Sequence, residues 1–376
     1  MAKTRADAAG DVAGLQASID AGPFDAVIAS SAENVQYGSD VLIATQRSIR
    51  DRLALLVWPR GADPVFVLCR VEEGYVRQES WVGDIRGYKE FVTAPVDLVA
   101  EVLSERGLAR GTVGCEMEHL PGKYVRDLQA RLPGLRIEGC DELFKRVRMR
   151  KTAREVATLT RGFRGTERAM LATFATVTEG EDEWSLSRRL ADNILRSGAE
   201  DVAFNHINAG RNTGFPHALP SGYRVRPGDL VKCDSGGHYG SYFSNVGRTA
   251  KMGRPTEEER DTWKRLRDIH AAIIDMLRPG NTGRELFEAA ARLHEQHRLP
   301  FPYAHNGHSI GLEVHERPMI SPFEDIAYEA GMVSTVETRV REAGERGLHM
   351  EDLVLITETG PVLLSDAFDN ERIYEI

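Results

Sequence analysis

The stretch Glu337-Thr-Arg-Val-Arg-Glu-Ala-Gly-Glu-Arg-Gly-Leu-His-Met-Glu351 carries two glutamates at equal distances from Gly344. If the chain turns at Gly344, the two glutamates become direct cross-strand partners, with Cβ atoms about 4.5–5.5 Å apart. Apolar residues such as Val336 and Leu353 flank both acids, which predicts a buried strand pair, Met332–Val340 with His349–Thr357. Apposed acids in such a place need an offsetting charge, and a divalent cation held by oxygen and imidazole ligands is the common solution.

A similar strand pair lies upstream. Leu230–Asp234 and Tyr242–Thr249 are the predicted strands. A turn centred between Tyr239 and Gly240 would make Asp234 and Asn245 direct partners. Both strand pairs therefore carry polar groups at matching places, and we look for chemistry where the two pairs meet.

Each strand pair follows two predicted helices, so that a helix–helix–hairpin unit occurs twice. The four helices are expected at about Thr152–Thr176, Glu183–Ser197, Glu257–Leu277 and Gly283–His297. The last two begin with capping boxes, Thr256-x-x-Glu259 and Thr282-x-x-Glu285, in which the hydroxyl and the carboxylate satisfy free backbone donors. The repeat predicts two halves related by a pseudo-twofold axis.

The segment before this repeat predicts a separate α/β domain, because short apolar strands alternate with amphipathic helices. The expected strands and helices are Asp25–Ser30, Leu53–Trp58, Pro64–Cys69, Val96–Arg106, Thr112–Glu116, Gly122–Arg131 and Leu135–Ile137. A length of 376 residues also favours two domains. We therefore divide the chain into residues 1–147 and 148–376.

Composition excludes several classes of protein. The net charge of −9 argues against a general nucleic-acid or acidic-membrane binder. No apolar run approaches the ~20 residues that a membrane span needs. Four cysteines without CxxC spacing, and no signal-peptide pattern, predict thiols in a reducing cytosol. The sequence thus predicts a cytoplasmic globular protein with no nucleic-acid or membrane partner.

A histidine adds an imidazole candidate to the predicted acid cluster. His308 lies in Gly307-His-Ser-Ile-Gly311, where two glycines let the backbone approach a ligand closely. A lone histidine is more often structural than a ligand, and eleven histidines make a chance placement easy. Spacing alone leaves both readings of His308 open.

Six ordered motifs resemble the pita-bread metallopeptidase superfamily, in its creatinase, prolidase and aminopeptidase P branch. They are Arg211-Asn-Thr-Gly-Phe-Pro-His217, Pro227-Gly-Asp-Leu-Val-Lys-Cys-Asp234, Tyr242-Phe-Ser-Asn-Val-Gly-Arg-Thr249, Gly307-His-Ser-Ile-Gly-Leu-Glu-Val-His-Glu-Arg-Pro318, Gly331-Met-Val-Ser-Thr-Val-Glu337 and Met350-Glu-Asp-Leu-Val-Leu-Ile356. In addition, Val147-Arg-Met-Arg-Lys-Thr-Ala-Arg-Glu155 resembles the junction after a creatinase-like N-terminal domain. The resemblance covers essentially the whole chain. It implies a creatinase-like N-terminal domain followed by an α+β pita-bread catalytic domain that contains the duplicated unit.

The resemblance also implies roles for individual residues. The family's dinuclear metal ligands fall on Asp234, Asn245, His308, Glu337 and Glu351. Asn245 stands where the family has a bridging aspartate, and a neutral amide oxygen bridges two cations poorly. We therefore expect at most one divalent ion (Mn, Fe, Co or Zn), or none.

Three catalytic residues are implied in the same way. His217 would donate a proton or hydrogen bond to the scissile group, His315 would steady the tetrahedral intermediate, and Glu337 would accept the proton of the attacking water. His305 and His238 have no counterpart in the family that we can assign, and we expect them either to lie next to the metal ligands without binding the ion or to lie at the surface.

Three functions compete at this point. The first is a metal-dependent Xaa-Pro dipeptidase or aminopeptidase that acts on a small or short-peptide substrate. The second is a metal-independent, creatinase-like hydrolase of a small C–N substrate such as an amidine or a cyclic diamino acid, which Asn245 favours. The third is a catalytically silent binding module. The resemblance also implies a homodimer whose pocket the other chain helps to close.

Overall fold

The computed structural model describes residues 3–49 and 51–376 and separates into two compact units. The first unit ends at Arg148 and the second runs from Met149 to Ile376. All four cysteines are buried free thiols. Across the described ranges, no helix is both long and apolar enough to cross a lipid bilayer.

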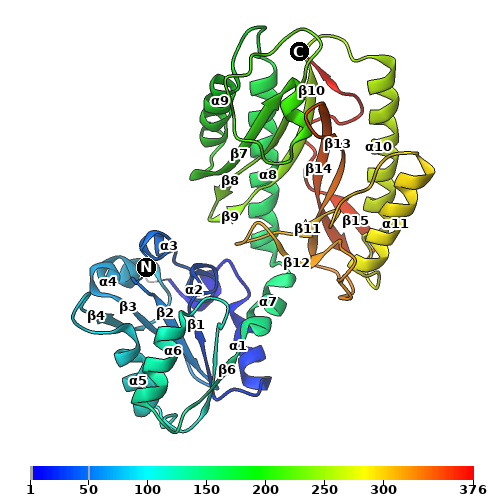
Figure 1. Cartoon of the computed structure of the whole chain (residues 1–376). Coiled ribbons are helices and arrows are strands. Elements are labelled where there is room, and N and C mark those ends of the chain that lie inside the picture. Colours follow the sequence, from blue (N-terminus) through cyan, green and yellow to red (C-terminus); the bar gives the residue numbers. More distant parts are fainter. Residues whose placement is uncertain (1–2, 50) are drawn as a thin grey trace. The chain divides into compact units, whose positions relative to one another are not determined.

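The first unit is a mixed six-stranded sheet in the order β4-β3-β2-β1-β5-β6, with helices beside it (Figure 1). Its helices and strands are α1 (Val12–Ala21), β1 (Ala26–Ala29), α2 (Ala32–Ser39), α3 (Ala44–Ser48), β2 (Leu55–Pro59), β3 (Val65–Cys69), α4 (Glu73–Glu79), β4 (Asp84–Tyr88), α5 (Pro95–Glu105), β5 (Thr112–Cys115), α6 (Gly122–Arg131), β6 (Arg136–Gly139) and α7 (Asp141–Met149). The central strands β1, β2 and β3 are buried along their whole length. Continuous apolar runs of this kind suit a sheet that is covered on both faces.

The second unit contains an eight-stranded sheet whose main path is β13-β14-β10-β8-β7. Its elements are α8 (Ala153–Phe174), α9 (Glu183–Arg196), β7 (Asp201–Ala209), β8 (Leu230–Tyr239), β9 (Tyr242–Phe243), β10 (Val246–Lys251), α10 (Glu257–Met276), α11 (Gly283–Gln296), β11 (His308–Ser309), β12 (Glu316–Met319), β13 (Val333–Glu342), β14 (Arg346–Thr357), β15 (Gly360–Leu363) and β16 (Tyr374–Glu375). Strands β11 and β12 form a separate pair. The predicted pita-bread architecture thus has its helices and hairpins in the expected order, while the pseudo-twofold relation between the halves stays a prediction.

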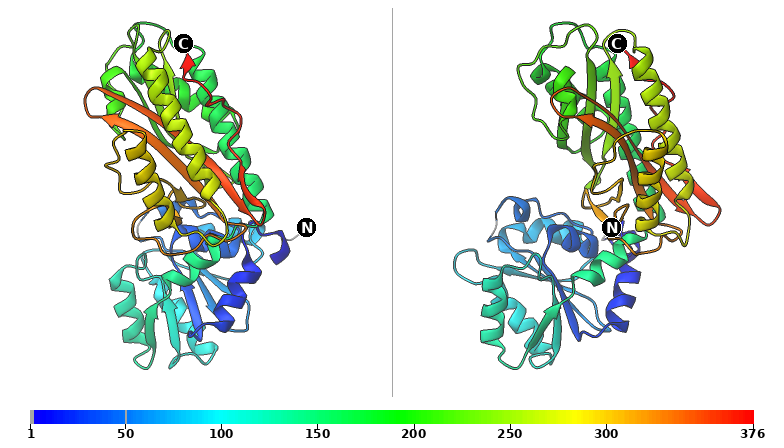
Figure 2. Two further views of the ribbon diagram at one scale, coloured as in Figure 1. Left: turned by 90° about the vertical axis from the view of Figure 1, so that its right-hand side faces the viewer. Right: turned by 45° about the vertical axis from the view of Figure 1, so that its right-hand side comes forward.

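Alternation along β13 and β14 decides which side chains face the helices. Even-numbered residues such as Val336, Val340 and Met350 pack in apolar clusters with Leu266 and Ile273 of α10, and Figure 2 shows α10 running along this hairpin. Both predicted capping boxes are present, at Thr256 of α10 and at Thr282 of α11. Because successive side chains in a strand point to opposite faces, the odd-numbered residues of the hairpin, Glu337 and Glu351 among them, face away from α10.

Candidate metal centre

One row of side chains crosses the larger sheet from β13 to β7. Glu337 lies directly opposite Glu351, which confirms the pairing predicted about Gly344. The row continues through Gly247 and Asp234 to His206 on β7. Directly opposed residues share one face of a sheet. Three acids and one imidazole therefore meet on the face away from α10.

The predicted pairing of Asp234 with Asn245 is wrong by two residues, because the turn lies one residue further along the chain than predicted. The turn consists of Gly240 and Ser241, whose φ angles are 58° and 66°. Positive φ at both central residues defines the tight type I′ turn, which matches the twist of the flanking strands. This turn places Asp234 opposite Gly247. The continuous strand predicted over 242–249 is also divided into β9 and β10 around Asn245.

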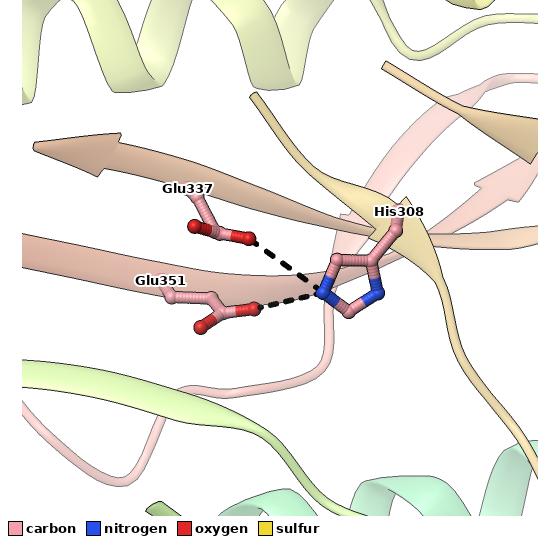
Figure 3. Close-up of side chains that lie close together, drawn as sticks. All are labelled: His308, Glu337 and Glu351. Carbon is pink, nitrogen blue, oxygen red and sulfur yellow. Dashed lines mark ion pairs between the residues drawn. The ribbon is translucent and has the colours of Figure 1, made fainter. Parts of the chain in front are cut away.

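His308 reaches the two glutamates from the short strand β11. Its Nε2 atom lies 3.6 Å from Oε1 of Glu337 and 3.6 Å from Oε1 of Glu351. Figure 3 marks both pairs with dashed lines. Its Nδ1 atom lies 2.9 Å from the carbonyl oxygen of Ser309. A carbonyl oxygen only accepts, so Nδ1 carries the proton and Nε2 directs its lone pair at the carboxylates. The ligand atoms of the three residues all lie within 4.8 Å of one another, a grouping that can hold one divalent ion.

Burial and mutual repulsion shift the charges of this cluster. Burial lowers the pKa of His308 to about 3, which keeps the imidazole neutral and able to bind a metal. Burial, with repulsion from Glu337, raises the pKa of Glu351 well above its usual range. Burial also acts to raise the pKa of Glu337, but the guanidinium of Arg339 and three imidazoles outweigh it and lower that pKa. A cation among these groups would relieve the cost of placing two acids together.

A second row, displaced by two residues along each strand, is basic. Arg339 lies opposite His349, and Lys232 lies two residues before Asp234 on β8. The NH1 group of Arg339 donates to Oε2 of Glu337. Its NH2 group donates to the carbonyl oxygen of His305 at 3.0 Å, and its guanidinium carbon lies 4.4 Å from the centre of the Tyr303 ring. Arg339 is thus held from several sides beside an implied metal ligand.

The ring of His349 occupies space that Gly247 leaves free. A Cβ atom at Gly247 would lie 2.7–2.9 Å from three atoms of this ring, so no larger residue fits there without displacing it. Nδ1 of His349 lies 3.6 Å from Oδ2 of Asp234, and Nε2 lies 3.9 Å from Oε2 of both Glu337 and Glu351. The ring of His349 therefore stands between Asp234 and the two glutamates.

Asn245 presents its amide to the same cluster. Its Nδ2 atom lies 3.4 Å from Nε2 of His308. Its Oδ1 atom is buried and has no hydrogen-bond partner among the described residues. An amide rotated by half a turn would offer that neutral oxygen to an ion bound at His308, but it would add no negative charge.

Two exposed histidines border the row. The His315 ring centre lies 4.1 Å from that of His308, and the His217 ring centre lies 5.2 Å from that of His206. Lys232 donates through Nζ to the carbonyl oxygens of Phe215, at 2.5 Å, and Pro216, at 3.1 Å. Lys232 thereby anchors the loop that carries His217. Both histidines are placed where a molecule bound at the acids could contact them.

His305 and His238 differ in their positions. Nδ1 of His305 lies 3.6 Å from Oε1 of Glu337, so His305 borders the acid cluster, the first of the two positions expected for it. His238 lies four residues after Asp234 on β8. It pairs with Asp201, and its ring makes an edge-to-face contact with the ring of Phe243. Strand alternation could have revealed Arg339 and Lys232, because each is two residues from a predicted ligand. No sequence signal pointed to His206.

The residues present fit one divalent ion better than two. His308, Glu337 and Glu351 supply an imidazole and two carboxylates, and both oxygens of buried Glu351 lack a hydrogen bond of ordinary geometry within the described chain. An ion needs such available donors. A second ion would need bridging anions, and Asn245 is neutral while Arg339 already carries a positive charge at Glu337.

Sequence comparisons agree with this fold. Residues 157–358 match metallopeptidase family M24, and residues 12–150 match the creatinase/prolidase N-terminal domain. The Xaa-Pro dipeptidase of Pyrococcus furiosus is 32% identical over 222 residues, which span 58% of this chain and 64% of that enzyme. The probable dipeptidase PepE of Mycobacterium tuberculosis is 28% identical over 346 residues, 91% of each chain. The crystal structure of dipeptidase PepE from Mycobacterium ulcerans superposes with a TM-score of 0.84 at 26% identity and covers 97% of both chains.

The family match covers more than half of the chain, and it coincides with the unit that contains the acid row. The order of motifs, the strand registers and the His308 cluster agree with it. The chain therefore belongs to metallopeptidase family M24 and carries a creatinase/prolidase N-terminal domain.

Proposed function

We propose that this protein hydrolyses the amide bond of a short peptide with the Xaa-Pro sequence, as a dipeptidase or aminopeptidase with a single divalent ion (Mn, Fe, Co or Zn). The observation that carries the proposal is the cluster of His308, Glu337 and Glu351, which places one imidazole nitrogen 3.6 Å from two apposed carboxylates. The Xaa-Pro preference comes from the names of the relatives. When bound, such an ion polarises a carbonyl group and lowers the pKa of a water molecule towards neutrality.

The side chains around this cluster have distinct tasks. Glu337 accepts the proton of the attacking water, because its pKa is lowered and it is therefore ionised at neutral pH. His217 donates to the scissile carbonyl or the leaving nitrogen, on a loop that Lys232 holds in place. His315, beside His308, steadies the oxygen on which negative charge develops.

A specific observation favours a second candidate. Arg339 neutralises Glu337, and the His349 ring stands among the acids, so the acid cluster has protein groups that offset its charge. A creatinase-like hydrolase of an amidine or cyclic diamino acid would use this arrangement without metal. The implied homodimer and the cytoplasmic location also stay predictions. The third reading, a binding module, has no need of His217 and His315 at the acid row.

Hydrolysis of Ala-Pro, measured by release of free proline, tests the proposal. We expect activity with added Mn²⁺, loss of activity with excess chelator, and recovery when Mn²⁺ is restored. Pro-Ala serves as the matched control and should not be cleaved. If Ala-Pro and longer Xaa-Pro peptides stay intact with Mn, Fe, Co and Zn, the proposal is wrong. Activity on a small amidine that persists in chelator would support the second candidate.

A further inference from the structure

Glu337 and Glu351 each direct one carboxylate oxygen towards His308 and the other towards His349. Oε1 of Glu337 and Oε1 of Glu351 each lie 3.6 Å from Nε2 of His308 (Figure 3). The Oε2 atoms of both residues lie 3.9 Å from Nε2 of His349. We call these the His308 side and the His349 side.

The His308 side has the character of an ion site. Its ligand atoms converge, and the nitrogen of His308 is unprotonated because Nδ1 donates to Ser309. On this side no fixed positive charge contacts Glu337 or Glu351 within the described part of the chain. The nearest basic groups there are the imidazoles of His305 and His308, and burial lowers the pKa of both.

The His349 side is already occupied by protein. The guanidinium of Arg339 donates to Oε2 of Glu337 and is fixed by the His305 carbonyl and the Tyr303 ring. The His349 ring, in the space above Gly247, lies between Oδ2 of Asp234 and the glutamates. A second ion on this side would have to displace the ring and approach a fixed positive charge in a buried setting, where repulsion is strong.

Charge balance leads to the same result. Asp234, Glu337 and Glu351 carry at most three negative charges, and Arg339 offsets one of them. The two that remain match one divalent ion. Lys232 and Arg341 also interact electrostatically with Asp234, so a second ion would leave the site with excess positive charge.

We propose that Arg339 takes the place of a second metal ion, so that this centre is built for one divalent ion on its His308 side. This inference rests on the single-ion centre of the proposed function and deepens it by assigning the residue that limits the centre to one ion. It concerns ion binding, and its test is therefore independent of which substrate the protein cleaves.

The test counts bound ions. The purified full-length protein is stripped with chelator, equilibrated with Mn²⁺, desalted, and analysed for metal per chain, with affinity measured by calorimetry. Wild type should bind one ion. Asn245→Asp and Arg339→Met each make the site more negative by one charge, so each single variant should still bind one. The double variant becomes more negative by two charges, the charge of one Mn²⁺, and should bind two.

Matched variants separate charge from position. Arg341 lies two residues after Arg339 on the same face of β13. The double variant Arg341→Met with Asn245→Asp makes the same change of charge without removing Arg339, and it should still bind one ion. Arg339→Gln combined with Asn245→Asp replaces the methionine variant if that protein fails to fold. Two ions in the wild type, none in the wild type, or one ion in the folded Arg339/Asn245 double variant would each overturn the inference. One ion in the wild type without Ala-Pro cleavage would count against the proposed function only.

Discussion

Glu337 and Glu351 lie directly opposite each other on β13 and β14, and each holds Oε1 within 3.6 Å of Nε2 of His308. Two apposed acids destabilise a sheet unless something offsets their charge. The pair is therefore a place where the fold gives up stability that a bound cation would restore.

Glu351→Gln should stabilise the metal-free protein and remove its response to metal. Replacing one of the two apposed acids by a neutral group of the same shape should raise the free energy of unfolding in chelator by up to about 1 kcal/mol. The variant should also lose most of the increase in melting temperature that Mn²⁺ gives the wild type. Thermal unfolding with and without Mn²⁺ measures both effects.

Glu167→Gln is the matched control for that experiment. Glu167 is equally buried, but it accepts from Arg248 on the opposite face of the sheet. Breaking this pair should lower stability whether or not Mn²⁺ is present. A Mn²⁺ response in Glu351→Gln as large as that of the wild type would show that Glu351 is not a ligand.

Asn245→Asp should raise the affinity for the first ion. The new carboxylate would stand beside His308, where the amide Nδ2 now lies 3.4 Å from Nε2. Without metal, a further acid in a buried acidic cluster should lower the melting temperature, and Mn²⁺ should reverse this loss. Calorimetric titration with Mn²⁺ gives the affinity.

Asn208→Asp controls for the chemical change at residue 245. Asn208 is buried on β7 opposite Lys232, in the basic row. It should show no gain in Mn²⁺ affinity. Equal affinities in the wild type and Asn245→Asp would place residue 245 outside the ion's coordination.

His217→Ala should lower turnover by about 100-fold or more, the usual worth of a positioned acid or base. Stability should change little because His217 is exposed to solvent. Steady-state kinetics on Ala-Pro measures the effect. His238→Ala is the control, since His238 pairs with Asp201 away from the cluster, and its kcat should stay close to that of the wild type. A loss below threefold at His217 would remove this residue from the mechanism.

Acid should destabilise the second unit in part through His294. Burial lowers the pKa of His294 to about 4. Its Nδ1 atom lies 3.0 Å from the carbonyl oxygen of Pro300, and the neutral imidazole donates this hydrogen bond from Nδ1–H. The unfolded chain takes up the proton near pH 6.5. The stability that neutral His294 contributes is therefore complete above about pH 6.5 and is lost as the pH falls towards 4, by about 1–2 kcal/mol at pH 5.

His294→Gln does not titrate and should remove that part of the pH dependence. Denaturant unfolding between pH 7 and pH 4 should give a shallower decline for His294→Gln than for the wild type. Parallel curves for the two proteins would show that His294 is not the group responsible.

Local pattern in the sequence was sufficient for several features of this protein. The symmetric spacing of Glu337 and Glu351 about Gly344 predicted their register, because a hairpin with a central turn pairs residues at equal distances from it. The capping boxes at Thr256 and Thr282 predicted where α10 and α11 begin, since the bonds involved span only three residues. The motif order indicated the family.

Turn geometry and contacts between distant segments decided the rest. The type I′ turn at Gly240–Ser241 shifted Asp234 to face Gly247, because backbone dihedrals, rather than residue counting, set where a tight turn lies. The ring of His349 fills the space above Gly247 only when β14 and β10 lie side by side. The guanidinium of Arg339 is held beside Glu337 by the His305 carbonyl and the Tyr303 ring, which lie in a distant segment of the chain. The sequence by itself determined which residues could bind a metal ion. The tertiary structure decided how the Arg339 guanidinium and the His349 ring are held against the acids, because their other contacts come from segments far apart in the chain.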